Sequence, residues 1–281
     1  MAGKLVCFGD LCVDVVGRSS GDETGADVTL ADLSIRPAGA ALNCAVAAAA
    51  EGVDVEMLGL VGDDDFGELV LRYLDSSRVG RRHVRRTKGR TGTVISIVDS
   101  AGQTKLYSYR GVNAQAYGPL PDCGGFVYVS GYSFQDTGSR LTAETLLSTG
   151  ARCALDPSFQ YARDFKRRRL EVEFLLPNLE EARLMTGRAA SAGPSSAVSP
   201  GDCCEALRAS GVKTVVVKLG PEGCCVNGEF VNSEAVSAVD TTGAGDAFAG
   251  TFLAAILKGN GVVEAARRAN RIAADLVSRK R

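Results

Sequence analysis

Apolar and polar positions follow two regular patterns along most of the chain. Short runs that are apolar throughout predict buried strands, and longer runs with apolar residues three and four positions apart predict helices between them. Strands of this kind that alternate with helices are typical of a parallel sheet covered on both faces, so we expect an α/β fold with ligands at the carboxyl ends of the strands. The predicted strands lie within 4–10, 54–60, 125–131, 152–157, 173–178 and 213–220, and the predicted helices within 41–52, 62–77, 140–150, 179–187 and 203–211.

Two stretches depart from this pattern. Residues 13–37 and 91–113 lack helical spacing, and their polar and apolar residues alternate instead, with a hairpin turn at DSAGQ (99–103). We expect these stretches to form a small second sheet that projects from the main domain as a lid. The Gly-, Ser- and Pro-rich segment 186–202 predicts a flexible surface loop. The whole chain, 1–281, is therefore expected to form one domain with lid strands from these two stretches.

The composition disfavours several classes of function. The 281 residues are 45% hydrophobic and carry a net charge of -1, which gives no overall attraction to nucleic acid or to an anionic membrane. Basic residues cluster at 81–90, 166–169 and 279–281, where we expect solvated surface, with steering of an anionic substrate as the alternative. No apolar run is long enough to span a bilayer, and Asp10 comes too early for a signal peptide, so we expect a cytoplasmic protein.

Nine cysteines and one histidine limit the chemistry further. No two cysteines have C-x-x-C spacing, so a zinc site is disfavoured. With His83 as the only histidine, a Ser–His or Cys–His catalytic pair is disfavoured as well. Four cysteines in apolar surroundings are predicted to be reduced core residues, namely Cys7, Cys44, Cys153 and Cys204.

The segment DTTGAGDAFAG (240–250) carries the strongest chemical signal. It follows a strand-like segment at 234–240 and precedes an alanine-rich stretch at 247–259 that favours helix. Amides at a helix N-terminus are unpaired, and glycines let an anion approach them closely. A Walker P-loop needs a lysine after the glycines, and a dinucleotide loop needs a glycine where Phe248 stands, so both are excluded. A plain turn is the alternative, but Asp246 is placed to accept a proton while these amides stabilise charge.

Five separated motifs, in the same order, resemble those of the ribokinase (PfkB) family of carbohydrate and nucleoside kinases. Each motif alone is weak, but the five together cover nearly the whole chain and are specific. The resemblance implies a three-layer α/β/α main domain with a mostly parallel sheet and a small β-sheet lid. It also implies an ATP-dependent kinase that phosphorylates a hydroxyl of a small sugar. The motifs are PAGAALN (37–43), LVGDDDFG (60–67), PNLEEARLMTG (177–187), VVVKLGPEG (215–223) and DTTGAGDAFAG (240–250).

The resemblance also implies roles for the residues of phosphoryl transfer. Asp246 would be the catalytic base that takes the proton from the attacking hydroxyl. The amides of Gly243, Ala244 and Gly245 would form an anion hole for the transferred phosphoryl group. The residues implied to contact ATP are Lys218, Gly220, Gly223 and Asn270.

Two cation sites follow from the same resemblance. Asn178 and Glu181 would hold Mg²⁺, mostly through water, although Glu181 alone would be interpreted as an exposed helix carboxylate. Asp240 and Thr242 would contribute to a K⁺ site beside the anion hole, with a simple turn residue as the alternative for Asp240.

The residues implied to contact the substrate lie in the first half of the chain. Asp14 and Asn43 would hydrogen-bond substrate hydroxyls, and Gly39 would allow close approach. The alternatives are a strand-end residue for Asp14 and an ordinary helix residue for Asn43. Arg110 and Asn113 resemble a segment that reaches the sugar or the phosphates, with a charge on the lid surface as the alternative for Arg110.

The chain departs from the family pattern in three places. Ala38 replaces the first of two glycines, which predicts a stiffer or differently angled lid hinge. Ser158 and Gln160 stand where many relatives carry Asn and Arg, which puts that part of the nucleotide or substrate contact in doubt. The sequence ends at IAADLVSRKR (272–281), where relatives often continue, so we expect a more open adenine-side pocket.

Other functions stay open at this point. A nucleoside kinase of the adenosine, cytidine or pseudouridine type is the main alternative, with Tyr107, Tyr109 or Tyr117 of the lid stacking on the base or packing the small sheet. A ligand-binding regulator that has lost catalysis is disfavoured by the presence of Asp246 and the other motif residues. The family implies a homodimer formed through the lid, and we expect no nucleic acid or membrane partner.

Overall fold

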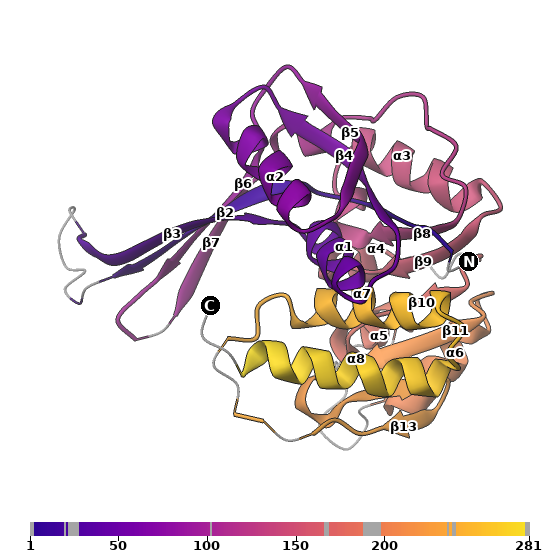
Figure 1. Cartoon of the computed structure of the whole chain (residues 1–281). Coiled ribbons are helices and arrows are strands. Elements are labelled where there is room, and N and C mark those ends of the chain that lie inside the picture. The colour runs from indigo at the N-terminus through magenta and orange to yellow at the C-terminus, as the bar shows by residue number, and fades with distance from the viewer. Residues whose placement is uncertain are drawn as a thin grey trace.

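The main body of the protein is a nine-stranded sheet in the order β13-β12-β11-β10-β9-β8-β1-β4-β5. The computed structural model describes residues 3–19, 21, 28–101, 103–165, 169–187, 198–234, 236–237 and 240–278. The strands from β11 to β5 pair in parallel, and the antiparallel hairpin β12–β13 completes the other edge (Figure 1). These strands are β1 (Leu5–Phe8), β4 (Val55–Gly62), β5 (Gly80–Thr87), β8 (Phe126–Ser130), β9 (Arg152–Asp156), β10 (Phe174–Leu175), β11 (Thr214–Lys218), β12 (Cys224–Val226) and β13 (Glu229–Val231).

Helices cover both faces of this sheet, which confirms the predicted α/β class. Helices α1, α2, α7 and α8 pack on one face, and α3, α4, α5 and α6 on the other. In β1, Leu5 and Cys7 point to the first group and Val6 and Phe8 to the second, because successive side chains of a strand alternate. The helices are α1 (Ala40–Ala50), α2 (Asp65–Ser76), α3 (Thr137–Ser148), α4 (Phe159–Asp164), α5 (Leu179–Met185), α6 (Pro200–Arg208), α7 (Ala244–Leu257) and α8 (Val262–Val277).

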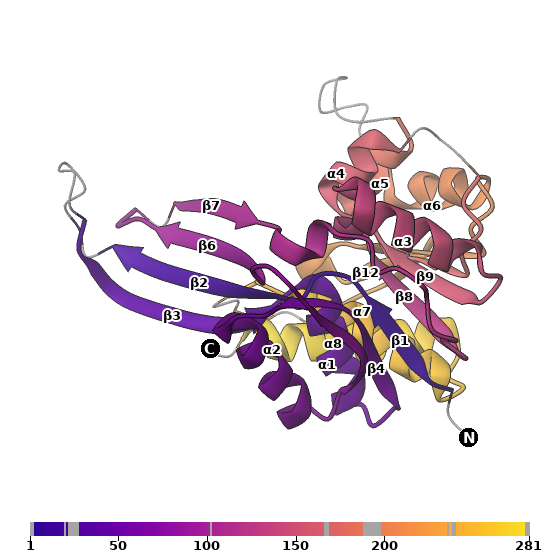
Figure 2. The same ribbon diagram turned by 90° about the horizontal axis from the view of Figure 1, so that it is seen from above.

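A second sheet of four strands, in the order β3-β2-β6-β7, projects from the main body (Figure 2). It consists of β2 (Cys12–Ser19), β3 (Leu30–Ala38), β6 (Gly92–Val98) and β7 (Thr104–Tyr109). The predicted small sheet is therefore present, with strands from both expected stretches. Asp99 closes the predicted hairpin turn, because its carboxylate accepts hydrogen bonds from the amides of Ala101 and Gln103.

The core confirms the expected use of cysteine. Cys7, Cys44, Cys153 and Cys204 are all at most 2% exposed. Among the described residues no helix is long and apolar enough to cross a membrane.

Three local features differ from the sequence prediction. The basic residues of 81–90 are exposed, as expected, but most of the segment also forms the edge strand β5, which was not predicted; in this strand Arg81 pairs with Asp75 and Arg86 with Glu68. The apolar pattern missed β5 because charged residues are typical of protected sheet edges. The described residues of 234–240 lie in no strand, and residues 235, 238 and 239 lie outside the described part.

The predicted loop at 186–202 is also shorter than expected at its carboxyl end. Residues 188–197 lie outside the described part, and helix α6 begins within the segment at Pro200. Ser199 caps this helix, and proline is favoured in a first turn, so the Pro and Ser residues mark a helix start here rather than a loop. The basic clusters at 166–169 and 279–281 lie almost wholly outside the described residues.

Candidate active site

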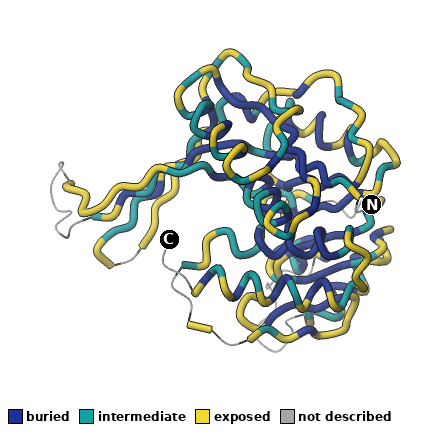
Figure 3. The backbone as a smooth tube through the Cα atoms, in the orientation of Figure 1, coloured by how far each residue is buried: buried dark blue, intermediate teal, exposed yellow. Residues whose placement is uncertain are grey.

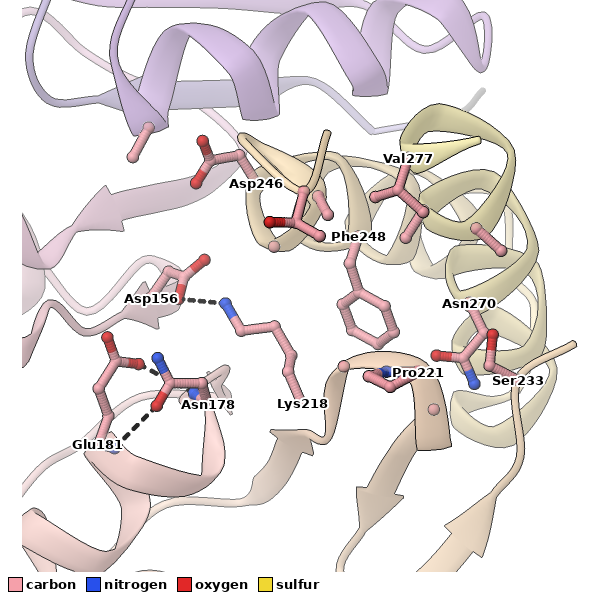
Figure 4. Close-up of a pocket in the computed structure, with 18 of the residues that line it drawn as sticks. Asp156, Asn178, Glu181, Lys218, Pro221, Ser233, Asp246, Phe248, Asn270 and Val277 are labelled. Atoms are coloured by element: carbon pink, nitrogen blue, oxygen red, sulfur yellow. Dashed lines mark hydrogen bonds and ion pairs between the residues drawn. The ribbon is translucent and has the colours of Figure 1, made fainter. Parts of the chain in front are cut away.

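A pocket of about 510 Å³ lies at the carboxyl ends of the central strands, as predicted for a sheet of this kind. Ser130 and Asp156 end the strands β8 and β9, and Lys218 ends β11. The start of α7 and one face of α8 close the opposite wall (Figure 4). The pocket has two ends, with Asp246, Asp156 and Lys218 at one and Asn270 and Val277 at the other.

The start of α7 leaves backbone amides open beside the pocket. Gly243 precedes the helix in the left-handed conformation, with φ of 74°, which favours glycine. Among the described residues, the amides of Gly243 and Gly245 have no hydrogen-bond partner. The amide of Ala244 differs from the expectation, because it donates to the carbonyl of Thr241 at 3.2 Å. Two of the three predicted donors are therefore available to an anion, while Ala244 closes the turn.

Asp246 lies in the first turn of α7 and is held by a residue far away in the sequence. The Asn43 amide Nδ2 donates to Asp246 Oδ2 at 2.8 Å. Asn43 sits on α1, whose first turn packs close to α7 (Figure 1). This bond orients the carboxylate of Asp246, which lines the pocket. Asn43, which was predicted to bind substrate, therefore contacts Asp246, the proposed base, at the edge of the site.

Lys218 is the cation nearest to the open amides. Its Nζ donates to Asp156 Oδ1 at 2.7 Å. A Cβ added at Gly245 would lie 3.5 Å from the same Nζ, so the ammonium lies beside Gly245. Burial lowers the pKa of the ammonium, but the charges of Asp156 and Glu181 raise it by more. The net change is upward, so Lys218 stays protonated. An ammonium and a helix N-terminus, both positive, share this end of the pocket, which favours a bound anion.

Asn178 and Glu181 form a capping box at the start of α5. Asn178 Oδ1 accepts from the amide of Glu181 at 2.8 Å, and Glu181 Oε2 accepts from the amide of Asn178 at 2.9 Å (Figure 4). Glu181 is 8% exposed, so it is not the exposed carboxylate of the alternative interpretation. Burial raises its pKa to about 7, although Lys218 opposes the change.

The donors present fit a magnesium ion that is held mainly by water and phosphate. The described residues contain no cluster of three or more His, Cys, Asp or Glu side chains able to hold a metal directly. One oxygen of Asn178 and one of Glu181 are already engaged in the capping box. Mg²⁺ keeps several waters and needs only one or two carboxylates, so outer contacts from Glu181 suit it.

Gly220, Gly223 and Asn270, which were predicted to contact ATP, all line this pocket. Gly223 has φ of 99°, and a Cβ there would lie 2.2 Å from the carbonyl oxygen of Val231, so only glycine fits. Asn270 Nδ2 donates to the carbonyl of Val231 at 2.8 Å. Its amide therefore ties α8 to β13 as well as lining the pocket.

The remaining predicted substrate residues lie at the root of the small sheet, apart from the pocket lining. Gly39 has φ of 129°, and a Cβ there would overlap the Asp10 carbonyl oxygen at 2.2 Å. Asp14 lies on β2, half-buried, 3.9 Å from Arg36. Asn113 is buried, and its amide both donates to and accepts from the backbone of Leu11, which uses both of its polar atoms.

Arg110 joins the small sheet to the main body through two ion pairs. Its guanidinium contacts the Asp10 carboxylate and donates through Nε to Asp136 Oδ2 at 2.7 Å. The side chain is only 17% exposed, so the alternative of a lid-surface charge is wrong. The described contacts of Arg110 are with protein carboxylates.

The other predicted positions divide between turns and the surface. Asp240 Oδ1 accepts from the amide of Thr242 at 2.9 Å, which is the turn geometry of the alternative interpretation. Tyr107 and Tyr109 are exposed on β7 and available for stacking. Tyr117 is not, because it is buried, its hydroxyl donates to the His83 carbonyl, and Arg85 covers its ring.

The departures from the family pattern have local explanations. Ala38 is 6% exposed at the end of β3, where it packs rather than opens the hinge. Ser158 caps α4 by accepting from the amide of Tyr161 at 3.3 Å. Gln160 does not line the main pocket but a second hollow between α3 and α4, together with Phe134 and Tyr161.

Three residues of this region escaped the sequence analysis, namely Asp10, Tyr132 and Asp156. Asp10 follows β1, Tyr132 follows β8 and Asp156 ends β9. A polar residue at the carboxyl end of a predicted parallel strand was the available signal, because such ends gather at one edge of the sheet.

The chain is similar to known sugar kinases over most of its length. Residues 2–281 match the pfkB family of carbohydrate kinases. The 2-dehydro-3-deoxygluconokinase of Thermoproteus tenax is 31% identical over 79% of this chain and 73% of its own length. The ribokinase of Haemophilus influenzae is 25% identical over 100% of this chain and 94% of its own.

Solved structures share the fold at lower sequence identity. The ribokinase of Thermotoga maritima superposes with a TM-score of 0.81 at 22% identity, covering 99% of this chain and 94% of that one. An Arabidopsis thaliana ribokinase, solved with ribose and ATP, gives 0.79 at 23% identity, covering 100% and 94%. With the strand-end pocket and the glycine turn before α7, these matches identify the chain as a member of the pfkB family of carbohydrate kinases, an ATP-dependent sugar or nucleoside kinase.

Proposed function

We propose that this kinase transfers the γ-phosphoryl group of ATP to a hydroxyl of a small sugar or sugar-like substrate, with Asp246 as the catalytic base. The observation that supports this most directly is the position of Asp246. Asn43 Nδ2 holds the Asp246 carboxylate through a hydrogen bond of 2.8 Å to Oδ2. This carboxylate lies at the same end of the pocket as the open amides of Gly243 and Gly245 and the ammonium of Lys218. A proton acceptor and an anion site therefore meet at one point.

The residues divide the reaction between them. Asp246 accepts the proton as the substrate oxygen attacks the γ-phosphorus in line and the bond to the β-phosphate oxygen breaks, leaving ADP. The amides of Gly243 and Gly245 and the ammonium of Lys218 face the charge that grows on the phosphoryl oxygens. These donors are fixed before the substrate binds, because the turn and the Asp156 ion pair hold them.

Cations would act at the same end of the pocket. Glu181 and Asn178 would hold Mg²⁺ mainly through water, and the ion would neutralise charge on the phosphates when bound. We also propose that Asp240 and Thr242 contribute to a K⁺ site, since their turn lies directly before the anion site. We also propose that the enzyme acts in the cytoplasm, as the sequence analysis led us to expect.

A nucleoside substrate is the second candidate. It is favoured by Tyr109, which is 58% exposed on β7 and is available to stack on a base. The adenosine kinase of Sinorhizobium meliloti shares the fold, with a TM-score of 0.79 at 21% identity.

We further propose a homodimer formed through the small sheet. Ile35, Val15, Ile95 and Tyr107 stand opposite one another across all four strands, so they form an apolar row on one face. Ile35, Ile95 and Tyr107 are 50%, 42% and 60% exposed. A second copy covering this row would bury it.

The test of the proposed function is the variant Asp246→Asn, which keeps the shape but removes the proton acceptor. We expect kcat to fall about a thousandfold, in the range typical of a lost general base, while binding of ATP and substrate changes little. An ADP-release assay with Mg-ATP across pentoses, hexoses, ketodeoxy acids and nucleosides measures it and names the substrate. The exposed Asp54→Asn is the control, and full activity of Asp246→Asn contradicts the mechanism.

A further inference from the structure

Tyr132 lines the pocket and lies on a tightly packed segment. It lies on η2 (Gly131–Phe134), the short helix that follows β8, and its neighbours Gly131, Ser133 and Phe134 are buried. A Cβ at Gly131 would lie 2.2 Å from the amide nitrogen of Ser158, so η2 packs tightly against the turn after β9. Phe134 packs against Tyr161 with ring centroids 4.6 Å apart. The backbone on both sides of Tyr132 is therefore fixed.

Tyr132 itself is 47% exposed and lines the pocket together with Asp246 and Glu181. Within the described part of the chain, no residue forms a hydrogen bond with its hydroxyl. At this exposure water can solvate the hydroxyl until a ligand takes its place. Here the ring and the hydroxyl are both presented to whatever enters the pocket.

The surroundings make this hydroxyl a hydrogen-bond donor. Burial and the nearby charges of Asp246, Glu181, Asp156 and Asp10 all raise its pKa, so it stays protonated at neutral pH. Of these charges, that of Asp246 raises the pKa most. Asp246 is the proposed base, which must itself contact the reacting hydroxyl. Asn270 and Val277 mark the end of the pocket where we propose that the nucleotide binds. Seen from Asp246, they lie beyond Lys218 and Phe248 (Figure 4).

We propose that Tyr132 is a substrate-binding residue that selects the phosphoryl acceptor. Its hydroxyl donates a hydrogen bond to an oxygen of the acceptor, and its ring packs on the apolar C–H face of the same molecule. This inference rests on the proposed function, because it assumes that the acceptor binds beside Asp246. The ring fixes the acceptor beside the base, so it contributes to affinity and orientation, not to proton transfer.

The test compares the variants Tyr132→Phe and Tyr132→Leu with the wild type. The acceptors are D-ribose, D-fructose, 2-dehydro-3-deoxy-D-gluconate and adenosine, each with Mg-ATP. For the acceptor that the wild type prefers, Tyr132→Phe should raise KM about three- to tenfold, as expected for one lost hydrogen bond. Tyr132→Leu should raise it further, because the packing surface of the ring is lost as well. KM for ATP and the melting temperature should stay within twofold and 2 °C, respectively, on the order of ordinary surface changes.

Tyr73→Phe is the matched control, since Tyr73 lies on α2 and does not line the pocket. An acceptor KM of Tyr132→Leu within twofold of the wild type overturns the inference, and so does a parallel rise of the KM for ATP. Failure of the proposed function looks different. If Asp246→Asn keeps full activity, or the wild type phosphorylates no acceptor in the full screen of pentoses, hexoses, ketodeoxy acids and nucleosides, the proposed reaction itself is wrong and the role of Tyr132 falls with it.

Discussion

The floor of the pocket and the small sheet are built in opposite ways. At the floor, Asp156 and Glu181 are 7% and 8% exposed, and each has a fixed partner. In the small sheet every residue of β7 is exposed, and β3 is mostly exposed as well (Figure 3). Charged groups can be held in place only where other residues surround them, whereas a thin sheet with two open faces has few such contacts.

This difference separates the proposed catalytic groups from the small sheet that we expect to act as a lid. The groups that we propose to act in phosphoryl transfer lie near the ends of strands buried on both faces. The small sheet meets the main body at a few tight points, among them Gly39 and the ion pairs of Arg110. A region with this little packing is typical of elements that move when a ligand binds.

The largest effect on activity is expected from a substitution at the floor of the pocket. Lys218→Met removes the ammonium beside the open amides, and we expect kcat to fall about a hundredfold, as for one lost donor to developing charge. Lys213→Met is the control, because Lys213 is exposed just before β11. Steady-state kinetics with Mg-ATP measures both variants. A kcat of Lys218→Met within threefold of the wild type contradicts the assigned role of this ammonium.

An intermediate effect is expected in the small sheet. Ile35→Glu places a charge in the apolar row, so we expect a dimer to dissociate to monomers at micromolar concentration, with the fold intact. Leu106→Glu is the control, because Leu106 is 65% exposed and points to the opposite face. Sedimentation velocity distinguishes the two states. A wild type that is monomeric at this concentration rules out the proposed dimer, and a dimer that survives Ile35→Glu places the interface elsewhere.

The smallest effect concerns the junction of the two regions. Burial raises the pKa of Asp10 to about 6, against the opposing charge of Arg110 and with help from Asp136. A carboxyl with a raised pKa binds its proton more tightly in the folded state, so stability falls as pH rises from about 4 to 6 and then levels. The contribution is at most about 3 kcal/mol for two pKa units.

The variant Asp10→Asn tests this directly, since it removes the titrating group. Urea unfolding at several pH values should show a free energy of unfolding that declines between pH 4 and 6 more steeply in the wild type than in the variant. Parallel curves for the two proteins contradict the assignment of this pH dependence to Asp10.

Most elements of the main sheet could be predicted because their signal is local. Apolar runs such as that of β11 and the spacing of α2 report burial and period within a few residues. The edge strand β5 could not be predicted in this way, because its charged residues are stabilised by Asp75, Glu56 and Glu68 from elsewhere in the chain.

The sequence by itself determined the glycine turn at the start of α7 and the motif residues around the proposed site. The turn and the capping box of Asn178 and Glu181 depend on neighbours one to three positions away, so they are recorded locally, while the proposed roles of these residues come from the resemblance to the family. Only the tertiary structure decided their partners. Asn43 reaches Asp246 across 203 positions, Lys218 reaches Asp156 across 62, and Arg110 reaches Asp10 across 100. Such pairs exist because the parallel topology brings strand and helix ends to one edge, and no local pattern in the chain records that arrangement.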